Sequence, residues 1–155
     1  MKTHLLSAGK KGQHAFLLAG ILLLLSFASS ATTYYVSPLG NDNTGTGTLA
    51  NPWKTLRKAT STVTAAGNTI HLVAGTYTET QASSLAPGVS LEGEGLATTI
   101  VISNITGQWS NLLSLSSGQD TNGNQSISGI TFDGQYVNET TYKTWIAIWI
   151  TGRSN

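Results

Sequence analysis

The sequence predicts an all-β protein in which short strands stack as a parallel β-helix behind one N-terminal helix. After Gly67, six short runs alternate apolar and polar residues, and turns rich in glycine, asparagine and serine separate them. No second helical pattern interrupts these runs. The turns differ in length, which a stack of repeated coils tolerates because insertions grow outward.

An antiparallel sandwich or barrel is the alternative, because these folds also consist of many short strands. They favour two-residue hairpins, and Asn122-Gly123 is a good dipeptide for such a turn. The other connections are irregular, so the β-helix is the favoured prediction.

The N-terminal part begins with a short strand at Tyr34–Ser37. An amphipathic helix is expected from Pro52 to about Ala66, with Asn51 as its N-cap and Gly67 as its stop. Apolar residues at helical spacing form its inner stripe, namely Trp53, Leu56, Ala59 or Thr60, and Val63. We expect this helix to cap the first edge of the strands, whose unpaired backbone groups otherwise invite association.

Six strands are expected after the helix. They are Ile70–Val73, Val89–Gly93, Thr99–Ile102, Leu112–Leu115, Ser126–Phe132 and Ile146–Ile150.

Residues 1–31 have the pattern of a secretory signal peptide. Three lysines precede an apolar run at Ala15–Phe27, and small residues follow up to Ala31, where we expect cleavage, with Ser30 as the alternative. The run is shorter than the roughly 20 residues of a membrane-spanning helix, although an uncleaved anchor is the competing interpretation. The mature protein is therefore expected to be secreted or periplasmic and free of the membrane.

Loss of this segment changes the charge. The whole chain has eight basic and seven acidic residues, and Lys2, Lys10 and Lys11 leave with the signal, so five basic and seven acidic residues remain, a net charge of −2. Such a balance argues against a nucleic-acid partner, which needs a basic patch. The chain has no cysteine, so disulfides cannot stabilise it.

Residues 34–79 carry a recognisable series of motifs. They are Tyr35-Val36-Ser37, Gly40-Asn41-Asp42, Asn51-Pro52-Trp53-Lys54-Thr55-Leu56, Gly67-Asn68-Thr69-Ile70 and Ala74-Gly75-Thr76-Tyr77. This segment resembles the N-terminal start of secreted right-handed parallel β-helix proteins of the pectate-lyase-like superfamily. The resemblance implies that fold and a carbohydrate-active protein. It leaves the chemistry open, because lyases, hydrolases, epimerases and proteins of unassigned activity share this start.

From the signal pattern and the resemblance together, we expect three segments in the chain. They are a signal peptide (1–31), a strand, loop and capping helix (32–67), and the first coils of the β-helix (68–155). A polar terminal repeat is not evident before Asn155. We therefore expect the chain to be the N-terminal part of a longer protein, with catalytic residues beyond residue 155.

Two functions are compatible with this organisation. The first is a polysaccharide lyase of pectate, alginate or chondroitin type, or a glycoside hydrolase, acting on acidic or cell-wall polysaccharide. Lyases need basic groups or Ca²⁺ near the substrate carboxylate, and Lys143 and Arg153 are the basic residues after Gly67. Glu92 and Glu94 are the candidate calcium ligands, because alternation places both on one face.

The second function is a non-catalytic surface, adhesion or glycan-binding scaffold. If Ile146, Ile148 and Ile150 face the core, then Trp145 and Trp149 face outward on one side. Exposed aromatic rings can stack on sugars, although a long turn could instead cover them.

Two further residues are given structural interpretations. His71, the one histidine of the mature chain, is expected to be an outward-facing surface residue, and Asp133 is expected to form a turn.

Overall fold

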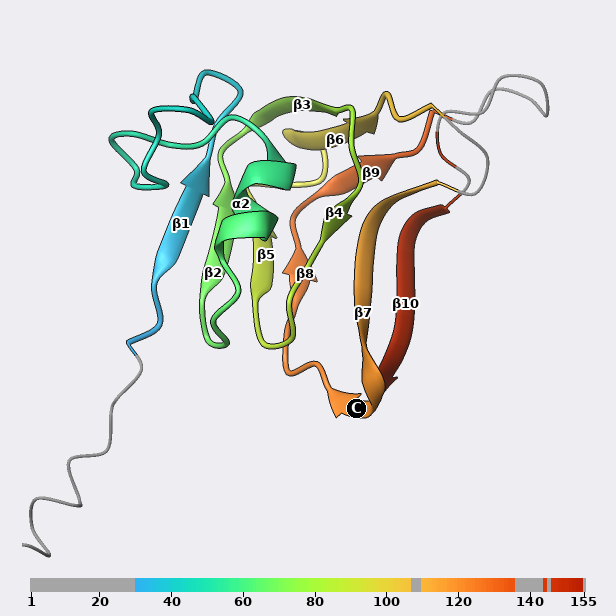
Figure 1. Cartoon of the computed structure of the whole chain (residues 1–155). Helices are drawn as coiled ribbons and strands as arrows, with labels where there is room; N and C mark the ends of the chain where they lie inside the picture. The colour runs from blue at the N-terminus through green and yellow to red at the C-terminus, as the bar shows by residue number, and fades with distance from the viewer. Residues whose placement is uncertain (1–29, 107–109, 136–143, 145, 155) are drawn as a thin grey trace, which may run out of the picture.

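The computed structural model describes residues 30–106, 110–135, 144 and 146–154 (Figure 1). The expected signal peptide, Lys143 and Trp145 lie outside these residues. None of the helices in the described part is long and apolar enough to cross a membrane.

In the described residues, ten strands form three parallel sheets. Sheet I contains β1 (Thr33–Val36), β2 (Thr69–Leu72), β5 (Ser90–Gly93) and β8 (Ile127–Ser128). Sheet II contains β3 (Gly75–Glu79), β6 (Thr99–Ser103) and β9 (Thr131–Asp133). Sheet III contains β4 (Ser83–Ser84), β7 (Asn111–Asn122) and β10 (Ile146–Ser154).

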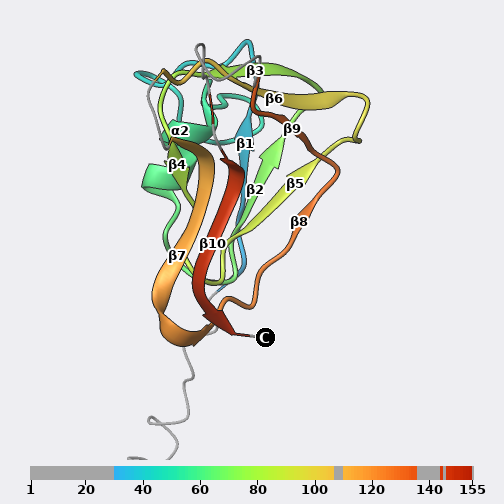
Figure 2. The same cartoon turned by 90° about the vertical axis from the view of Figure 1, so that its right-hand side faces the viewer.

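The chain visits the sheets in the same order on three successive passes, β2–β3–β4, β5–β6–β7 and β8–β9–β10 (Figures 1 and 2). Every pairing between the described strands is parallel. The predicted all-β class with parallel strands is therefore confirmed, and the antiparallel sandwich is excluded for the described part. Parallel strands need long connections, and here the other two sheets supply them.

Apolar side chains stack from pass to pass and fill the interior. Residues of successive strands that lie opposite one another form these stacks, namely Ile70–Leu91–Ile127 in sheet I, Tyr77–Val101–Phe132 in sheet II and Leu113–Ile148 in sheet III. Alternate residues of each strand point to opposite faces, so the residues between them face outward.

The expected single strand Ser126–Phe132 is wrong, because the chain turns within it from β8 to β9. Gly129 sits at this corner with a φ of 65°, a conformation that favours glycine. It also lies against Gly93 at the matching corner of the previous pass: a Cβ on Gly129 would be 2.2 Å from the Gly93 carbonyl oxygen. The corner therefore needs glycine for both conformation and space.

The helix is shorter than predicted, and its N-cap is different. Helix α2 spans Leu56–Thr62, and the Thr55 side chain accepts a hydrogen bond from the Lys58 N–H. Trp53, expected within the helix, instead pairs with β1: its N–H donates to the Tyr35 carbonyl. Gly67 lies in the turn before β2 and does not end the helix. The expected apolar stripe is nevertheless buried.

The first edge of the strands is covered in two ways. The loop before α2 pairs with β1, since the Tyr35 N–H donates to the Gly47 carbonyl and the Ser37 N–H to the Trp53 carbonyl. Helix α2 contacts β1, β2, β3 and β4. Arg57 of this helix donates from Nη1 to the Ala82 carbonyl beside β4, at 2.7 Å.

Candidate functional site

A row of polar and aromatic side chains crosses the outer face of sheet I. Tyr35, His71, Glu92 and Ser128 lie opposite one another on β1, β2, β5 and β8. The neighbours of His71 on β2, Ile70 and Leu72, are buried. Their alternation with His71 supports the prediction that its side chain points outward.

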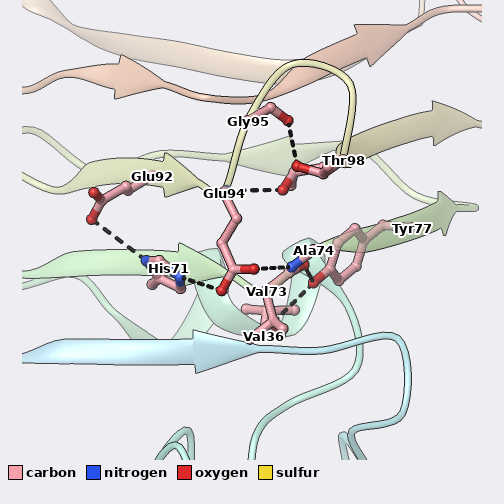
Figure 3. Close-up of polar contacts among 10 residues, drawn as sticks. Val36, His71, Val73, Ala74, Tyr77, Glu92, Glu94, Gly95 and Thr98 are labelled. Atoms are coloured by element: carbon pink, nitrogen blue, oxygen red, sulfur yellow. Dashed lines mark hydrogen bonds and ion pairs between the residues drawn. The ribbon is translucent and has the colours of Figure 1, made fainter.

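His71 lies between two carboxylates rather than standing alone on the surface (Figure 3). Its Nδ1 is 3.5 Å from Glu92 Oε2, and its Nε2 is 3.3 Å from Glu94 Oε1. Only the imidazolium, with a proton on each ring nitrogen, can donate to both carboxylates. The Tyr35 ring centroid is 5.4 Å from that of His71, at an interplanar angle of 54°.

Glu94 is held more firmly than its exposure suggests. Its Oε2 accepts a hydrogen bond from the Ala74 N–H at 3.0 Å (Figure 3). Its own N–H donates to Thr99 Oγ1 at 2.9 Å. The Ala74 N–H, followed by His71, lowers the pKa of Glu94. Nearby, burial raises the pKa of Tyr77 far above its ordinary value, and its hydroxyl contacts the Val36 and Val73 carbonyls. Tyr77 is therefore a neutral structural group.

The surroundings of Glu92 and Glu94 do not fit the calcium site that the sequence suggested. Ca²⁺ takes six to eight oxygen ligands, whereas an imidazole lies between these carboxylates and an N–H occupies one oxygen of Glu94. In the described part of the chain, no three Asp, Glu, His or Cys side chains are grouped so as to hold a metal ion.

A second candidate surface is the outer face of sheet III. Ser84, Ser114 and Trp149 lie opposite one another on β4, β7 and β10. The Ser114 and Ser116 hydroxyl oxygens are 2.9 Å apart. Trp149 is 47% exposed and lies opposite Ser114, between the buried Leu113 and Leu115, which agrees with the expected outward orientation. Two passes of the chain thus present hydroxyl groups beside the exposed indole of the third.

Ile150 lies on the side of β10 that faces the core, but no neighbouring side chain covers it in the described part of the chain. Ile150 pairs with buried Leu115, yet it is 62% exposed. Among the described strands, β10 is the outermost of sheet III, so no described strand lies beyond Ile150. Ile148, closer to the start of β10, packs against the core.

The remaining predicted site residues have separate positions. Arg153 donates from Nη2 to the Leu85 carbonyl at 3.1 Å and from Nε to the Leu115 carbonyl at 3.5 Å. It thereby links β10 to the two earlier passes of sheet III. Asp133 accepts hydrogen bonds from the backbone and side chain of Gln135, as expected of a turn residue.

Tyr35 was not predicted as a site residue. Its sequence signal is weak, because only the pairing of β1 with β2 places it beside His71, and the two residues are 36 positions apart.

Comparisons with protein-family models, with curated proteins and with solved structures found no match to this chain. The functional interpretation therefore depends on the geometry of these two surfaces.

Proposed function

We propose that this chain is a secreted right-handed parallel β-helix protein that binds polysaccharide on the outer face of sheet III. The three ordered passes through parallel sheets support the β-helix. The strong preference of parallel connections for a right-handed path supports its hand. The signal-like pattern of residues 1–31 supports secretion.

The exposed Trp149 beside the serine row carries the proposal. An indole presents a large rigid apolar surface on which the apolar face of a sugar ring can stack. Serine hydroxyls both donate and accept hydrogen bonds, as sugar hydroxyls require. From Ser84 to Trp149 the row crosses three strands, or about 10 Å. That length suits a polymer lying across the strands.

The residues of this row are uncharged. Ser84, Ser114, Ser116, Trp149 and Thr151 contribute no formal charge. Screening by salt weakens attraction between exposed charges but has little effect on stacking. Retention on a polysaccharide through this face should therefore persist at high salt.

Replacement of Trp149 tests the proposal. We expect Trp149→Ala to reduce retention on an insoluble glycan panel of cellulose, chitin, xylan and pectin about tenfold, equivalent to about 1.4 kcal/mol. Trp149→Tyr should keep most of the retention. Leu96→Ala is the matched control, because Leu96 is also exposed, at 66%, but lies between β5 and β6. Equal retention by wild type and Trp149→Ala, with unchanged folding, would contradict the proposal.

A second candidate function is acid–base catalysis on a sugar, favoured by the position of His71 between two carboxylates and beside Tyr35. A positioned acid or base typically contributes 10²–10⁴-fold to a rate. If wild type releases unsaturated products or new reducing ends from pectate, alginate or chondroitin, His71→Gln should remove that activity while retention persists. The absence of product from wild type would remove this candidate and leave the binding function intact.

A further inference from the structure

A cavity of about 360 Å³ lies on the other side of β10 from Trp149, with Ile150 as its apolar wall. Asn122, Asn124, Gln125 and Arg153 supply polar side chains, and none of its described lining residues is acidic. The exposed indole and this cavity are therefore separate features, on opposite faces of one strand.

Two of the residues that line this cavity each have a buried polar atom without a hydrogen-bond partner, Arg153 Nη1 and Gln125 Oε1. The other polar atoms of both side chains are used. Arg153 Nε and Nη2 donate to the Leu115 and Leu85 carbonyls, and Gln125 Nε2 donates to the Val89 carbonyl. Buried polar groups are usually paired, so one cationic donor and one neutral acceptor are left unsatisfied at the same cavity.

Gly123 lies close to both of these side chains. A Cβ at this position would lie 3.0 Å from Gln125 Oε1 and 3.5 Å from Arg153 Cδ. Both side chains therefore border the same point above the backbone, where a methyl group would crowd Gln125 Oε1.

We propose that this cavity binds a small carboxylate that also carries a hydroxyl group, such as a free hydroxy acid or a sugar acid. The carboxylate would accept from Arg153 Nη1 in a charge-assisted hydrogen bond. The hydroxyl would donate to Gln125 Oε1, and carbon-bound hydrogens would contact Ile150. Such a ligand satisfies both unpartnered atoms at once, whereas a simple carboxylate or a neutral sugar satisfies one.

Titration calorimetry of the full chain with four sodium salts or sugars tests the ligand class. Galacturonate and glycolate should bind with Kd values near the millimolar range, and acetate and galactose at least about tenfold more weakly. Binding of galacturonate alone would identify a sugar acid as the ligand, and binding of both would identify the hydroxy-carboxylate group itself. No saturable binding of either, or equal binding of acetate, would overturn the proposal.

Gly123→Ala tests the location, because its methyl group would lie 3.0 Å from Gln125 Oε1, the far end of a flexible side chain, and 3.5 Å from Arg153 Cδ. We expect at least a tenfold loss of affinity. Gly118→Ala is the matched control, since Gly118 lies in β7, which ends just before Gly123, and its Cβ would meet only Thr121 Oγ1 at an ordinary 3.5 Å. Equal affinities of the two variants would refute the location. Trp149→Ala should leave this binding unchanged, so failure here is distinct from failure of polysaccharide binding.

Discussion

Two glutamates show how single carboxylates hold different parts of this molecule. Glu79 is buried, and its oxygens accept hydrogen bonds from the Leu56 and Arg57 N–H groups at the start of α2. Burial raises its pKa, and those two N–H groups oppose the rise. Glu94 is exposed, and the Ala74 N–H and His71 lower its pKa. Backbone N–H groups thus lower the pKa of both carboxyls. The net pKa shift is upward for Glu79 and downward for Glu94, because only Glu79 is buried away from water.

The lowered pKa of Glu94 predicts a pH-dependent contribution to stability. A carboxyl whose pKa falls on folding stabilises the protein above its ordinary pKa of 4.5, and that contribution is lost as the pH falls through the lowered value. Wild type should therefore be more stable than Glu94→Gln near pH 6, and the difference should shrink below about pH 4.

Urea unfolding of both proteins at pH 3 to 7 measures this difference. Glu92→Gln is the control, because Glu92 reaches His71 but accepts no backbone hydrogen bond in the described contacts. A difference that grows as the pH falls would contradict the assignment.

At the scale of elements, α2 depends on a local cap and on contacts from distant strands. Thr55 caps its first turn, and Asp42 in turn accepts hydrogen bonds from the Lys54 and Thr55 N–H groups and from the Thr55 hydroxyl. These contacts explain why the helix begins at Leu56. Asn51 and Pro52 form a good local start signal, but that segment pairs with the loop and β1 instead.

Thr55→Ala should lower the free energy of unfolding by about 1 kcal/mol, the usual cost of losing a threonine N-cap. Thr55→Ser should recover most of the loss, because serine keeps the hydroxyl. Thr62→Ala, at the exposed end of the same helix, serves as the control. Thermal or urea unfolding checks the order of the three variants. A Thr55→Ala protein as stable as Thr62→Ala would show that the cap contributes nothing.

Apolar patterning predicted most strands but missed β3 and β4. Strand β3 buries Tyr77 and Glu79, and β4 buries Ser83, so the buried residues of these strands include polar types that the alternation rule does not detect. The parallel class was predictable because irregular turns and a lack of helices favour it. The sheet I row was not, because its successive members are 36, 21 and 36 residues apart. Because the turns differ in length, the members of this row have no regular spacing in the sequence.

At the scale of the whole molecule, the stacking of corners matters as much as the stacking of strands. Gly93 and Gly129 meet at successive corners between sheets I and II, and the Gly95 N–H donates to the Gly129 carbonyl at 3.0 Å. This contact fixes the distance between the second and third passes at the point where the chain changes direction.

Two glycine variants separate the cost of a left-handed backbone conformation from the cost of a steric clash. Gly67→Ala should cost about 1 kcal/mol, because Gly67 has a φ of 87° but a Cβ there would meet nothing within 4 Å. Gly129→Ala has the same conformational cost and in addition a backbone clash, so it should lose about 1–3 kcal/mol more. Urea unfolding measures both. Equal losses in the free energy of unfolding would show that the corners at Gly93 and Gly129 can move apart without an energetic cost.

The covered first edge also sets the direction in which a growing chain can fold. A ribosome releases the N-terminal residues first, so the loop that pairs with β1 and the helix beside β4 emerge before the later passes. Each new pass then meets a template in which the outer edge of β1 is already hydrogen-bonded to the loop. That pairing disfavours the joining of two nascent chains through β1 and leaves the opposite edge of the sheet for the next pass.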